Sequence, residues 1–240
     1  MLESPAMDVS WILDDLNEPQ RQAVTAPLGS LRVLAGAGSG KTRVLTRRIA
    51  WLLAMENASP WSILAVTFTN KAAAEMRGRV EAMLDQPIGG LWIGTFHGIA
   101  HRLLRQHWQE ARLPRGFQIL DSDDQNRLLK RVLRGLNLDE KKWPPPQVAG
   151  FVNRCKDEGQ RPADLADDGM FNETEYPQIY TIYQQECERG GLVDFGELLL
   201  RVYELWRDNP DLLTHYRERF QHVLVDEFQD TNVIQYNWVR

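Results

Sequence analysis

The stretch Ala35-Gly36-Ala37-Gly38-Ser39-Gly40-Lys41-Thr42 organises the rest of the chain. An apolar run over residues 31–35 leads into it and is typical of a short buried strand. Residues 43–53 follow, with apolar side chains at helical spacing and basic residues between them. A glycine-rich loop between a strand and a helix predicts a phosphate-binding loop.

The residue types in this loop suit a nucleoside triphosphate. Glycines let the backbone curl so that successive N–H groups point at one anion, and the helix that follows adds its positive dipole end. Lys41 can reach the β- and γ-phosphates, and the Thr42 hydroxyl can ligate Mg²⁺. The strict pattern G-x-x-x-x-G-K-[ST] has glycine where this chain has Ala35, but Gly38 and Gly40 are in place. The loop therefore predicts nucleotide binding and leaves the reaction open.

Length and composition are those of a globular protein of 240 residues, enough for one large or two modest domains. Because the net charge is -5, any contact with nucleic acid needs a local basic surface. Cys155 and Cys187 have no metal-type spacing, which argues against a disulfide framework or a zinc site and fits a reducing cytosol. No apolar run approaches the ~20 residues that span a membrane. We expect a cytoplasmic protein whose residues 1–7 form a disordered extension without signal-peptide features.

Strands and helices alternate over the first 110 residues. Apolar runs at 63–68 and 91–96 predict two more strands. Helical patterns follow them, over residues 70–84 and 97–108. This alternation predicts a parallel sheet covered by helices, the α/β class.

From Asp121 onward the pattern is mostly helical. Helices are predicted, in order, over residues 122–136, 147–157, 173–189, 195–207 and 210–220. Ser122 and Gln125 form a plausible capping box for the first of them. A fourth buried strand follows at 223–226, so the chain predicts a helical insertion within an α/β domain.

Two carboxylates stand where that last strand ends. In an open parallel sheet, ligands bind outside the carboxyl ends of the strands, which puts Asp226 and Glu227 near the phosphate loop. Asp226 would hold the Mg²⁺ shell, and Glu227 would orient and activate the attacking water. A GTP-binding switch protein is disfavoured, because Asn70-Lys71-Ala72-Ala73 fails the Asn-Lys-x-Asp pattern at Ala73. The loop does not exclude a small-molecule kinase, but the acid pair favours an ATPase.

Four segments stand in an order that resembles motifs I, Ia, Ib and II of the UvrD/Rep-type superfamily 1 DNA helicases. They are Ala-Gly-Ala-Gly-Ser-Gly-Lys-Thr (35–42), Ala-Val-Thr-Phe-Thr-Asn-Lys-Ala-Ala-Ala-Glu-Met (65–76), Gly-Thr-Phe-His-Gly (94–98) and Val-Asp-Glu-Phe-Gln-Asp-Thr (225–231). Leu16-Asn17-Glu18-Pro19-Gln20 is similar to the adenine-reading Q motif of the same family. The resemblance covers essentially the whole chain after residue 7 and implies a RecA-like P-loop sheet, domain 1A (8–112 plus 220–240), with helical subdomain 1B inserted at 113–219.

The resemblance also implies roles for the nucleotide site. Gln20 would hydrogen-bond the adenine edge, Arg43 would stack on the base, and Gln229 would sit near the γ-phosphate. ATP and Mg²⁺ are the implied cofactors, with Thr42 and Asp226 on the metal.

For the DNA track the resemblance implies contacts with single-stranded DNA from Thr67, Phe68, Asn70, Lys71, Thr95 and His97. The residues alone predict differently, with Phe68 in the core and Asn70 as a helix N-cap. The implied activity is 3′–5′ DNA unwinding coupled to ATP hydrolysis, in DNA repair, at single-strand/duplex junctions. Two alternatives stay open: the helicase subunit of a recombination helicase–nuclease, or a non-catalytic nucleotide- and DNA-binding fragment.

Several family motifs that should follow motif II are missing from this chain. The sequence contains no Gly-Asp-x-x-Gln segment and no second RecA-like lobe with its γ-phosphate arginines. We therefore expect an N-terminal fragment with half an ATP site, an incomplete sheet and little or no helicase activity by itself. Its partners would be the missing lobe, DNA and repair proteins.

Two other clusters have plainer interpretations. His97 and His101 are four residues apart, but Gly98 stands where a zinc protease has glutamate, so a metal role is disfavoured. A basic stripe at helical spacing is most often a solvated face, although a phosphate track is the sharper option. The stripe consists of Arg127, Lys130, Arg131 and Arg134.

Overall fold

The computed structural model describes residues 10–36, 38–166 and 175–240. The chain divides into two compact units. The first unit runs through Thr95 and includes His215–Gln229, and the second contains Phe96–Thr214 and Asp230–Arg240. The division into subdomains 1A and 1B, with borders at 112 and 220, stays a prediction.

A three-stranded parallel sheet forms the centre of the first unit. Its strands are β1 (Ile63–Thr67), β2 (Trp92–Thr95) and β5 (His222–Val225), in the order β2-β1-β5. All five residues of β1 are buried, as expected for a central strand with neighbours on both sides. The predicted α/β class with a parallel sheet is confirmed.

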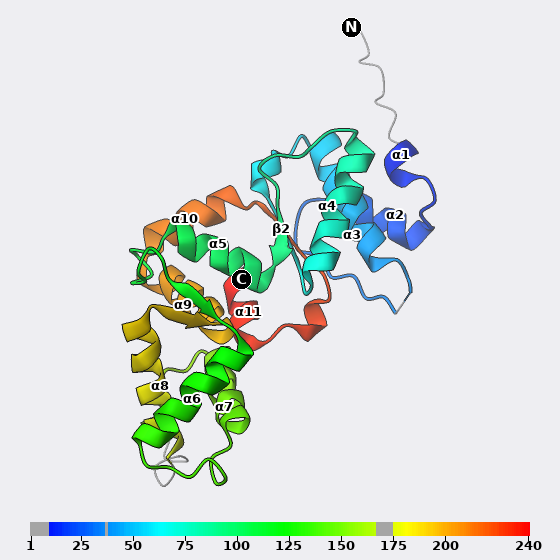
Figure 1. Cartoon of the computed structure of the whole chain (residues 1–240). Coiled ribbons are helices and arrows are strands. Elements are labelled where there is room, and N and C mark those ends of the chain that lie inside the picture. Colours follow the sequence, from blue (N-terminus) through cyan, green and yellow to red (C-terminus); the bar gives the residue numbers. More distant parts are fainter. Residues whose placement is uncertain (1–9, 37, 167–174) are drawn as a thin grey trace, which may run out of the picture. The chain divides into compact units, whose positions relative to one another are not determined.

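Helices α3 (Lys41–Ala54) and α4 (Asn70–Leu84) pack beside this sheet (Figure 1). Helices α1 (Ser10–Leu13) and α2 (Glu18–Thr25) pack against α3. A shared core joins α3 and α4 to the strands through apolar side chains that include Ile49, Leu52, Ile63, Met76 and Val80. This core fixes the start of α3, and therefore the phosphate loop, relative to the sheet.

Residues 31–35 are not the buried strand that the sequence predicts. They pair with no strand in the described chain, and Leu31 and Leu34 are 55% and 79% exposed. A strand of this length gains little unless a neighbour satisfies its backbone groups. β5 bonds to β1 alone among the described strands, so its other side is free, but the run does not pair with that side and its apolar side chains stay exposed.

Two helix caps also differ from the predicted ones. Thr69, not Asn70, caps α4, and its Oγ1 accepts a hydrogen bond from the Ala72 N–H at 3.1 Å. Asp121, not Ser122, caps α6 (Ser122–Gly135), accepting from the Asp124 N–H at 2.8 Å. Both capping residues have the extended backbone that an N-cap needs, and each predicted cap is the first helical residue instead.

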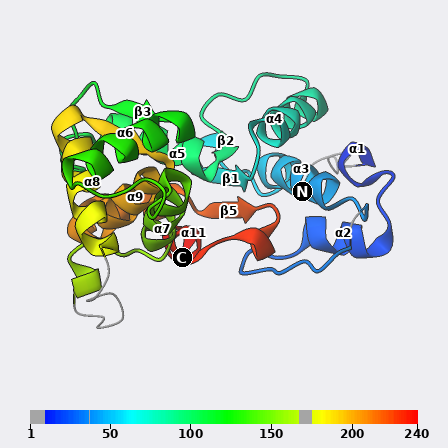
Figure 2. The same ribbon diagram turned by 60° about the horizontal axis from the view of Figure 1, so that its bottom comes forward.

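The second unit is mostly helical, as Figure 2 shows. Its further helices are α5 (Phe96–Gln106), α7 (Pro145–Asp157), α8 (Tyr176–Gly190), α9 (Phe195–Asp208) and α11 (Val233–Val239), while α10 (Pro210–Arg219) has residues in both units. The sequence does not predict a small parallel pair of strands that the structure contains, β3 (Gln118–Leu120) with β4 (Leu192–Asp194). Three-residue strands are too short to show an alternating pattern.

The described residues lack a membrane-spanning helix and a metal-type cluster of side chains. No helix there is long and apolar enough to cross a membrane. No cluster of three or more histidine, cysteine or acidic side chains that could hold a metal ion occurs there. Cys155 and Cys187 are buried free thiols.

Candidate nucleotide and DNA site

The glycine-rich loop has the backbone that its sequence predicts. Gly38 and Gly40 have φ values of 74° and 85°, which glycine adopts without the steric cost that other residues meet. Helix α3 begins at Lys41, and its N-cap, Gly40, supplies no side chain to the first turn. The N–H groups of that turn therefore suit an incoming anion. Ala37, also predicted to line the site, lies outside the described residues.

The Lys41 ammonium lies at the mouth of the loop. Its Nζ donates to the carbonyl oxygens of Ala35 at 3.3 Å and Gly36 at 3.4 Å. The same Nζ is 3.6 Å from Oε1 of Glu227. Segments nearly two hundred residues apart in sequence thus meet at one cation, as the order of the motifs predicts.

The acid pair stands where β5 ends. Asp226 is buried, and its N–H donates to the Val66 carbonyl at 2.9 Å, which ties the turn to β1. Glu227 has a left-handed backbone with φ 50°, and its N–H donates to Oδ1 of Asp226 at 3.1 Å. Gln229 donates its side-chain amide to Oε2 of Glu227. The turn therefore holds Glu227 between Lys41 and Gln229.

Burial raises the pKa of Asp226 above its ordinary value, and the neighbouring Glu227 charge raises it further. The Glu227 N–H and the Lys41 cation oppose this shift. A bound metal ion would oppose it as well, because it stabilises the ionised carboxylate.

Gln20 connects the amino-terminal helix α2 to the phosphate loop. Its backbone and side chain form a capping box with Asn17. Its Nε2 donates to the Ser39 carbonyl at 2.8 Å, and a Cβ on Gly40 would lie only 2.9 Å from that Nε2. The side chain therefore lies against the loop; a contact with adenine stays a prediction.

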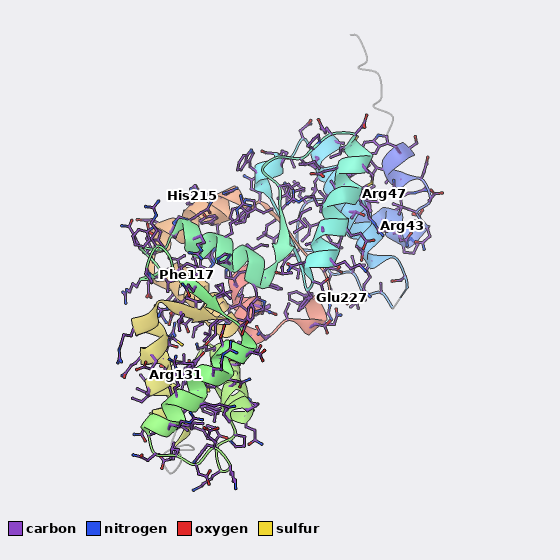
Figure 3. The ribbon with its side chains drawn as sticks, in the orientation of Figure 1. Arg43, Arg47, Phe117, Arg131, His215 and Glu227 are labelled. Carbon is purple, nitrogen blue, oxygen red and sulfur yellow. The ribbon has the colours of Figure 1, made fainter. Side chains whose placement is uncertain are left out.

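Two further predicted ligands follow Lys41 on α3. Thr42 is half-buried at the first turn, and Arg43 is exposed, donating Nη1 to the Asp15 carbonyl at 3.3 Å. Figure 3 labels Arg43 and Glu227 among the side chains of this unit. The hydroxyl of Thr42 and the carboxylate of Asp226 are hard oxygen donors, which is the donor chemistry that suits Mg²⁺.

Predicted DNA contacts in the first unit gather where β1 and β2 end. Thr67 and Thr95 are register partners on these strands. Thr67 is fully buried, and its hydroxyl donates to the Thr69 carbonyl at 3.1 Å. Thr67 therefore supports the turn after β1. Asn70 and Lys71 are exposed at the start of α4. Phe68 is 38% exposed, so the expectation that it belongs to the core is wrong.

In the second unit, His97 pairs with an aromatic side chain that sequence reasoning missed. The rings of His97 and Phe195 meet edge to face with centroids 5.8 Å apart. Burial lowers the pKa of His97. Phe195 is 47% exposed, and the signal that could have found it is Asp194, whose capping role makes Phe195 the first helical residue.

The basic stripe on α6 faces solvent, as both the plainer interpretation and a phosphate track require, so the two alternatives stay open. All four of its side chains are exposed. Arg127 pairs with Asp124, and Arg134 pairs with Glu140 at 2.9 Å. His101 accepts a hydrogen bond from Arg105 at 3.0 Å.

A glycine loop at the start of a helix, with its lysine beside an acid pair at the end of a parallel strand, is the arrangement of P-loop nucleotide-binding proteins. The chain belongs to the UvrD/REP helicase family: the model of the UvrD/REP helicase N-terminal domain matches residues 16–240. The family predicted from the ordered motifs is confirmed, and the parallel sheet is consistent with its RecA-like fold.

Curated relatives agree with this assignment. DNA helicase II of Escherichia coli (strain K12) is 61% identical over 234 residues, covering 98% of this chain and 32% of the relative. DNA helicase II of Haemophilus influenzae is 60% identical over 238 residues, 98% of this chain and 33% of the relative. ATP-dependent DNA helicase PcrA of Bacillus subtilis (strain 168) is 40% identical over 230 residues, 95% of this chain and 31% of the relative. The chain thus spans about a third of the length of these relatives.

Proposed function

We propose that this chain is the ATP- and DNA-binding portion of an ATP-dependent DNA helicase that moves 3′ to 5′ along single-stranded DNA. The observation that carries the proposal is the meeting of Lys41, at the mouth of the glycine loop, with Glu227 at the end of β5, at 3.6 Å. That contact joins the two halves of a nucleotide site from opposite ends of the chain.

ATP would bind with its phosphates on the loop of residues 35–40 and the first turn of α3. Lys41 would exchange Glu227 for the β- and γ-phosphates, because a dianionic phosphate is the stronger partner. The freed Glu227 would then orient the attacking water, and Gln229 would keep its carboxylate aligned. Gln20 and Arg43 would contact the base.

Thr42 and Asp226 would hold Mg²⁺, which supplies charge stabilisation of the phosphates when bound. The fit rests on their oxygen donors, since Mg²⁺ commonly takes one or two protein oxygens beside phosphate and water. The burial of Asp226 supports this assignment, because the metal would offset the cost of its buried charge.

Single-stranded DNA would bind along the carboxyl ends of β1 and β2. Phe68 and, in the second unit, Phe195 with His97 would stack on bases. Asn70, Lys71 and Thr95 would contact phosphates, and Thr67 would brace the turn before Phe68 from its buried position.

At the level of the whole protein we propose DNA repair as the process, with single-strand/duplex junctions and repair proteins as partners. Subdomains 1A (8–112 plus 220–240) and 1B (113–219) would form the first lobe, and a second RecA-like lobe would supply the arginines for the γ-phosphate. The two free thiols, Cys155 and Cys187, support a cytoplasmic location.

The test is nucleotide and DNA binding by residues 1–240, with Lys41→Ala and Phe68→Ala as the variants. We expect Lys41→Ala to weaken binding of a fluorescent ATP analogue about tenfold or more and to leave DNA binding unchanged, because charge-assisted bonds to phosphate are lost. Phe68→Ala should do the reverse, weakening binding of oligo(dT) by the ~1–3 kcal/mol typical of a base-stacking ring. Equal affinities of Lys41→Ala and the parent chain for the analogue would refute the proposed site.

A further inference from the structure

The amino-terminal edge of the sheet in the first unit carries a hollow that the nucleotide site does not use. β1 and β5 begin side by side there, with Ile63 opposite His222. The hollow has a volume of about 410 Å³ and is lined by residues that include Glu56, Trp61, Glu218 and Arg219. Since Asp226 and Glu227 follow the other end of β5, the hollow and the phosphate loop are at opposite edges of one sheet.

Trp61 is the largest exposed side chain in this hollow and is nevertheless held in place. Its side chain is 57% exposed. A Cβ added to Gly90, whose φ is 86°, would lie 2.5 Å from the indole, so the ring packs against bare backbone. The Trp61 carbonyl accepts a hydrogen bond from Nε of Arg219 at 3.3 Å. Such an indole offers contact area with little conformational entropy left to lose.

Arg219 supplies the support for this ring. Its guanidinium lies 4.8 Å from the centroid of Trp92, 5.0 Å from Phe220 and 5.3 Å from Trp61. Its Nη2 atom is buried and has no hydrogen-bond partner among the described residues, so aromatic faces stand in for oxygen acceptors there. Its charge is therefore directed at the rings instead of at the open hollow.

Two carboxylates of the lining, by contrast, are directed at solvent. Glu56 and Glu218 are exposed, and neither is in an ion pair with any residue that the structure describes. His222 adds little positive charge at pH 7, because burial and then the nearby Arg48 charge lower its pKa. The Glu56 charge acts on Arg48 and His222 without forming an ion pair with either. An exposed indole beside two carboxylates outside the described ion pairs favours a cation over a phosphate.

We propose that this hollow binds an extended, lysine- or arginine-bearing peptide segment of a partner protein. The cationic side chain stacks on the open part of Trp61 and pairs with Glu56 and Glu218. Leu28, 60% exposed in the same hollow, packs an apolar side chain of the peptide. The volume lies within the ~300–1,000 Å³ range of small-ligand sites, enough for a few side chains.

Two acetylated and amidated peptides test the proposal: Gly-Lys-Pro-Lys-Leu-Gly and Gly-Glu-Pro-Glu-Leu-Gly. The readout is the indole N–H resonance of Trp61 in ¹⁵N-labelled protein, assigned by its absence from the Trp61→Phe variant. We expect the lysine peptide to shift this resonance saturably and the glutamate peptide to leave it unmoved. Because Debye screening acts on exposed charges, the affinity should fall between 50 mM and 300 mM NaCl.

The double variant Glu56→Gln/Glu218→Gln should bind the lysine peptide about fivefold more weakly, since exposed ion pairs are individually weak. Glu110→Gln, which alters an exposed glutamate outside the hollow, is the matched control and should bind normally. Three results would each overturn the proposal: equal binding of both peptides, undiminished binding by the double variant, or a shift caused by oligo(dT) or by raised protein concentration in place of the lysine peptide. None of these readouts depends on ATP or on the proposed helicase function.

Discussion

In the proposed site Lys41 would have two competing partners, the Glu227 carboxylate and the phosphates of ATP, and this competition would decide when Glu227 is free to act on water. Without phosphate the ammonium faces one carboxylate and two carbonyl oxygens. Binding of ATP should transfer Lys41 to the phosphates and release Glu227 toward water. A substitution that removes the charge of Glu227 and keeps its shape can test both proposed roles, counter-ion of Lys41 and base for water.

Glu227→Gln in the full-length protein that we propose should therefore retain or slightly improve ATP binding and lower the turnover number about 10²–10⁴-fold, the typical value of a general base. Binding of a fluorescent analogue and steady-state hydrolysis measure the two effects separately. Glu218→Gln, which alters an exposed glutamate of α10 before the start of β5, is the matched control and should hydrolyse ATP normally. Normal turnover by Glu227→Gln would remove this residue from its assigned role.

Asp226 gives a prediction about stability and pH. Burial favours its neutral form, so its pKa is higher in the folded chain than in the unfolded chain. Such an acid stabilises the fold fully below its unfolded pKa and loses that contribution as pH rises through its folded pKa. At pH 7 without nucleotide or metal, Asp226→Asn should therefore melt at a higher temperature than the parent chain.

The difference in melting temperature should shrink as the pH falls through the folded pKa of Asp226, because the parent carboxyl then also becomes neutral. Asp208→Asn is a suitable comparison, because Arg207 holds the pKa of Asp208 below its usual range and the sign of the effect reverses. A lower melting temperature for Asp226→Asn at pH 7 would contradict the assigned cost of the buried charge.

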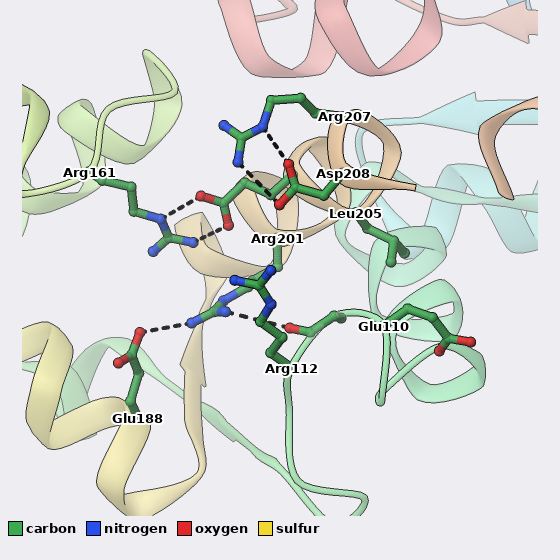
Figure 4. A pocket seen from close by; sticks show the side chains of 10 residues that line it. Glu110, Arg112, Arg161, Glu188, Arg201, Leu205, Arg207 and Asp208 are labelled. Carbon is green, nitrogen blue, oxygen red and sulfur yellow. Dashed lines mark hydrogen bonds and ion pairs between the residues drawn. The ribbon is translucent and has the colours of Figure 1, made fainter. Parts of the chain in front are cut away.

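At the scale of elements, helices α7 and α9 are joined by a buried ionic network. Lys156 is 1% exposed, and its Nζ lies 2.7 Å from Asp194 and 2.9 Å from Glu197. Burial alone would lower the pKa of Lys156, but these two carboxylates raise it above its ordinary value. Arg161 and Arg201 also pair with Glu197, at 2.9 Å and 2.6 Å, and both line the pocket in Figure 4.

Replacing Lys156 by methionine should destabilise the chain by about 3–5 kcal/mol, because it leaves two buried acids without their central cation. Urea unfolding followed by circular dichroism measures this free energy. Lys142→Met, at an exposed lysine that lies over the Trp143 ring at 5.9 Å, should change it by less than about 1 kcal/mol. If both variants lost a similar free energy of unfolding, the buried network would not be the source of the stability lost in Lys156→Met.

Elements with a full local signal could be predicted from the sequence. Helix α4 begins at Asn70 and ends at Leu84, as its apolar spacing predicts, and β1 and β5 follow their apolar runs within a residue or two. The run at 31–35 shows where such reasoning fails: its composition is that of a strand, but strand formation depends on tertiary context, and the run does not join the free side of β5 among the described strands. The sequence also does not predict the three-residue strands β3 and β4, because their pairing is a tertiary contact and leaves no local pattern.

The sequence predicts those parts of the candidate site whose residues belong to motifs with a known order along the chain. The Lys41–Glu227 contact follows from two motifs on one sheet edge. The bond from Gln20 to the Ser39 carbonyl does not, because nothing in Leu16-Asn17-Glu18-Pro19-Gln20 shows what the amide contacts. Phe195 was missed because an isolated phenylalanine is usually part of a core, and only its place after a capping aspartate marks it as exposed.

At the scale of the whole molecule, the chain holds one side of the proposed ATP site. Unwinding by a two-lobed motor needs lobes that close and open on DNA as ATP turns over, and arginines from outside the phosphate loop contribute about 10³–10⁵ in rate in related enzymes. This chain spans about a third of the length of its relatives. Residues 1–240 should therefore bind an ATP analogue and oligo(dT) without displacing a strand.

The full-length protein that we propose should displace a strand from a duplex with a 3′ single-stranded tail and not from one with a 5′ tail. A fluorescence strand-displacement assay with both substrates measures this polarity, and Lys41→Ala in the full-length protein is the control that should be inactive on either. Unwinding by residues 1–240 alone would show that one lobe suffices. Preference of the full-length protein for a 5′ tail would leave the ATP site intact as a proposal and overturn the polarity.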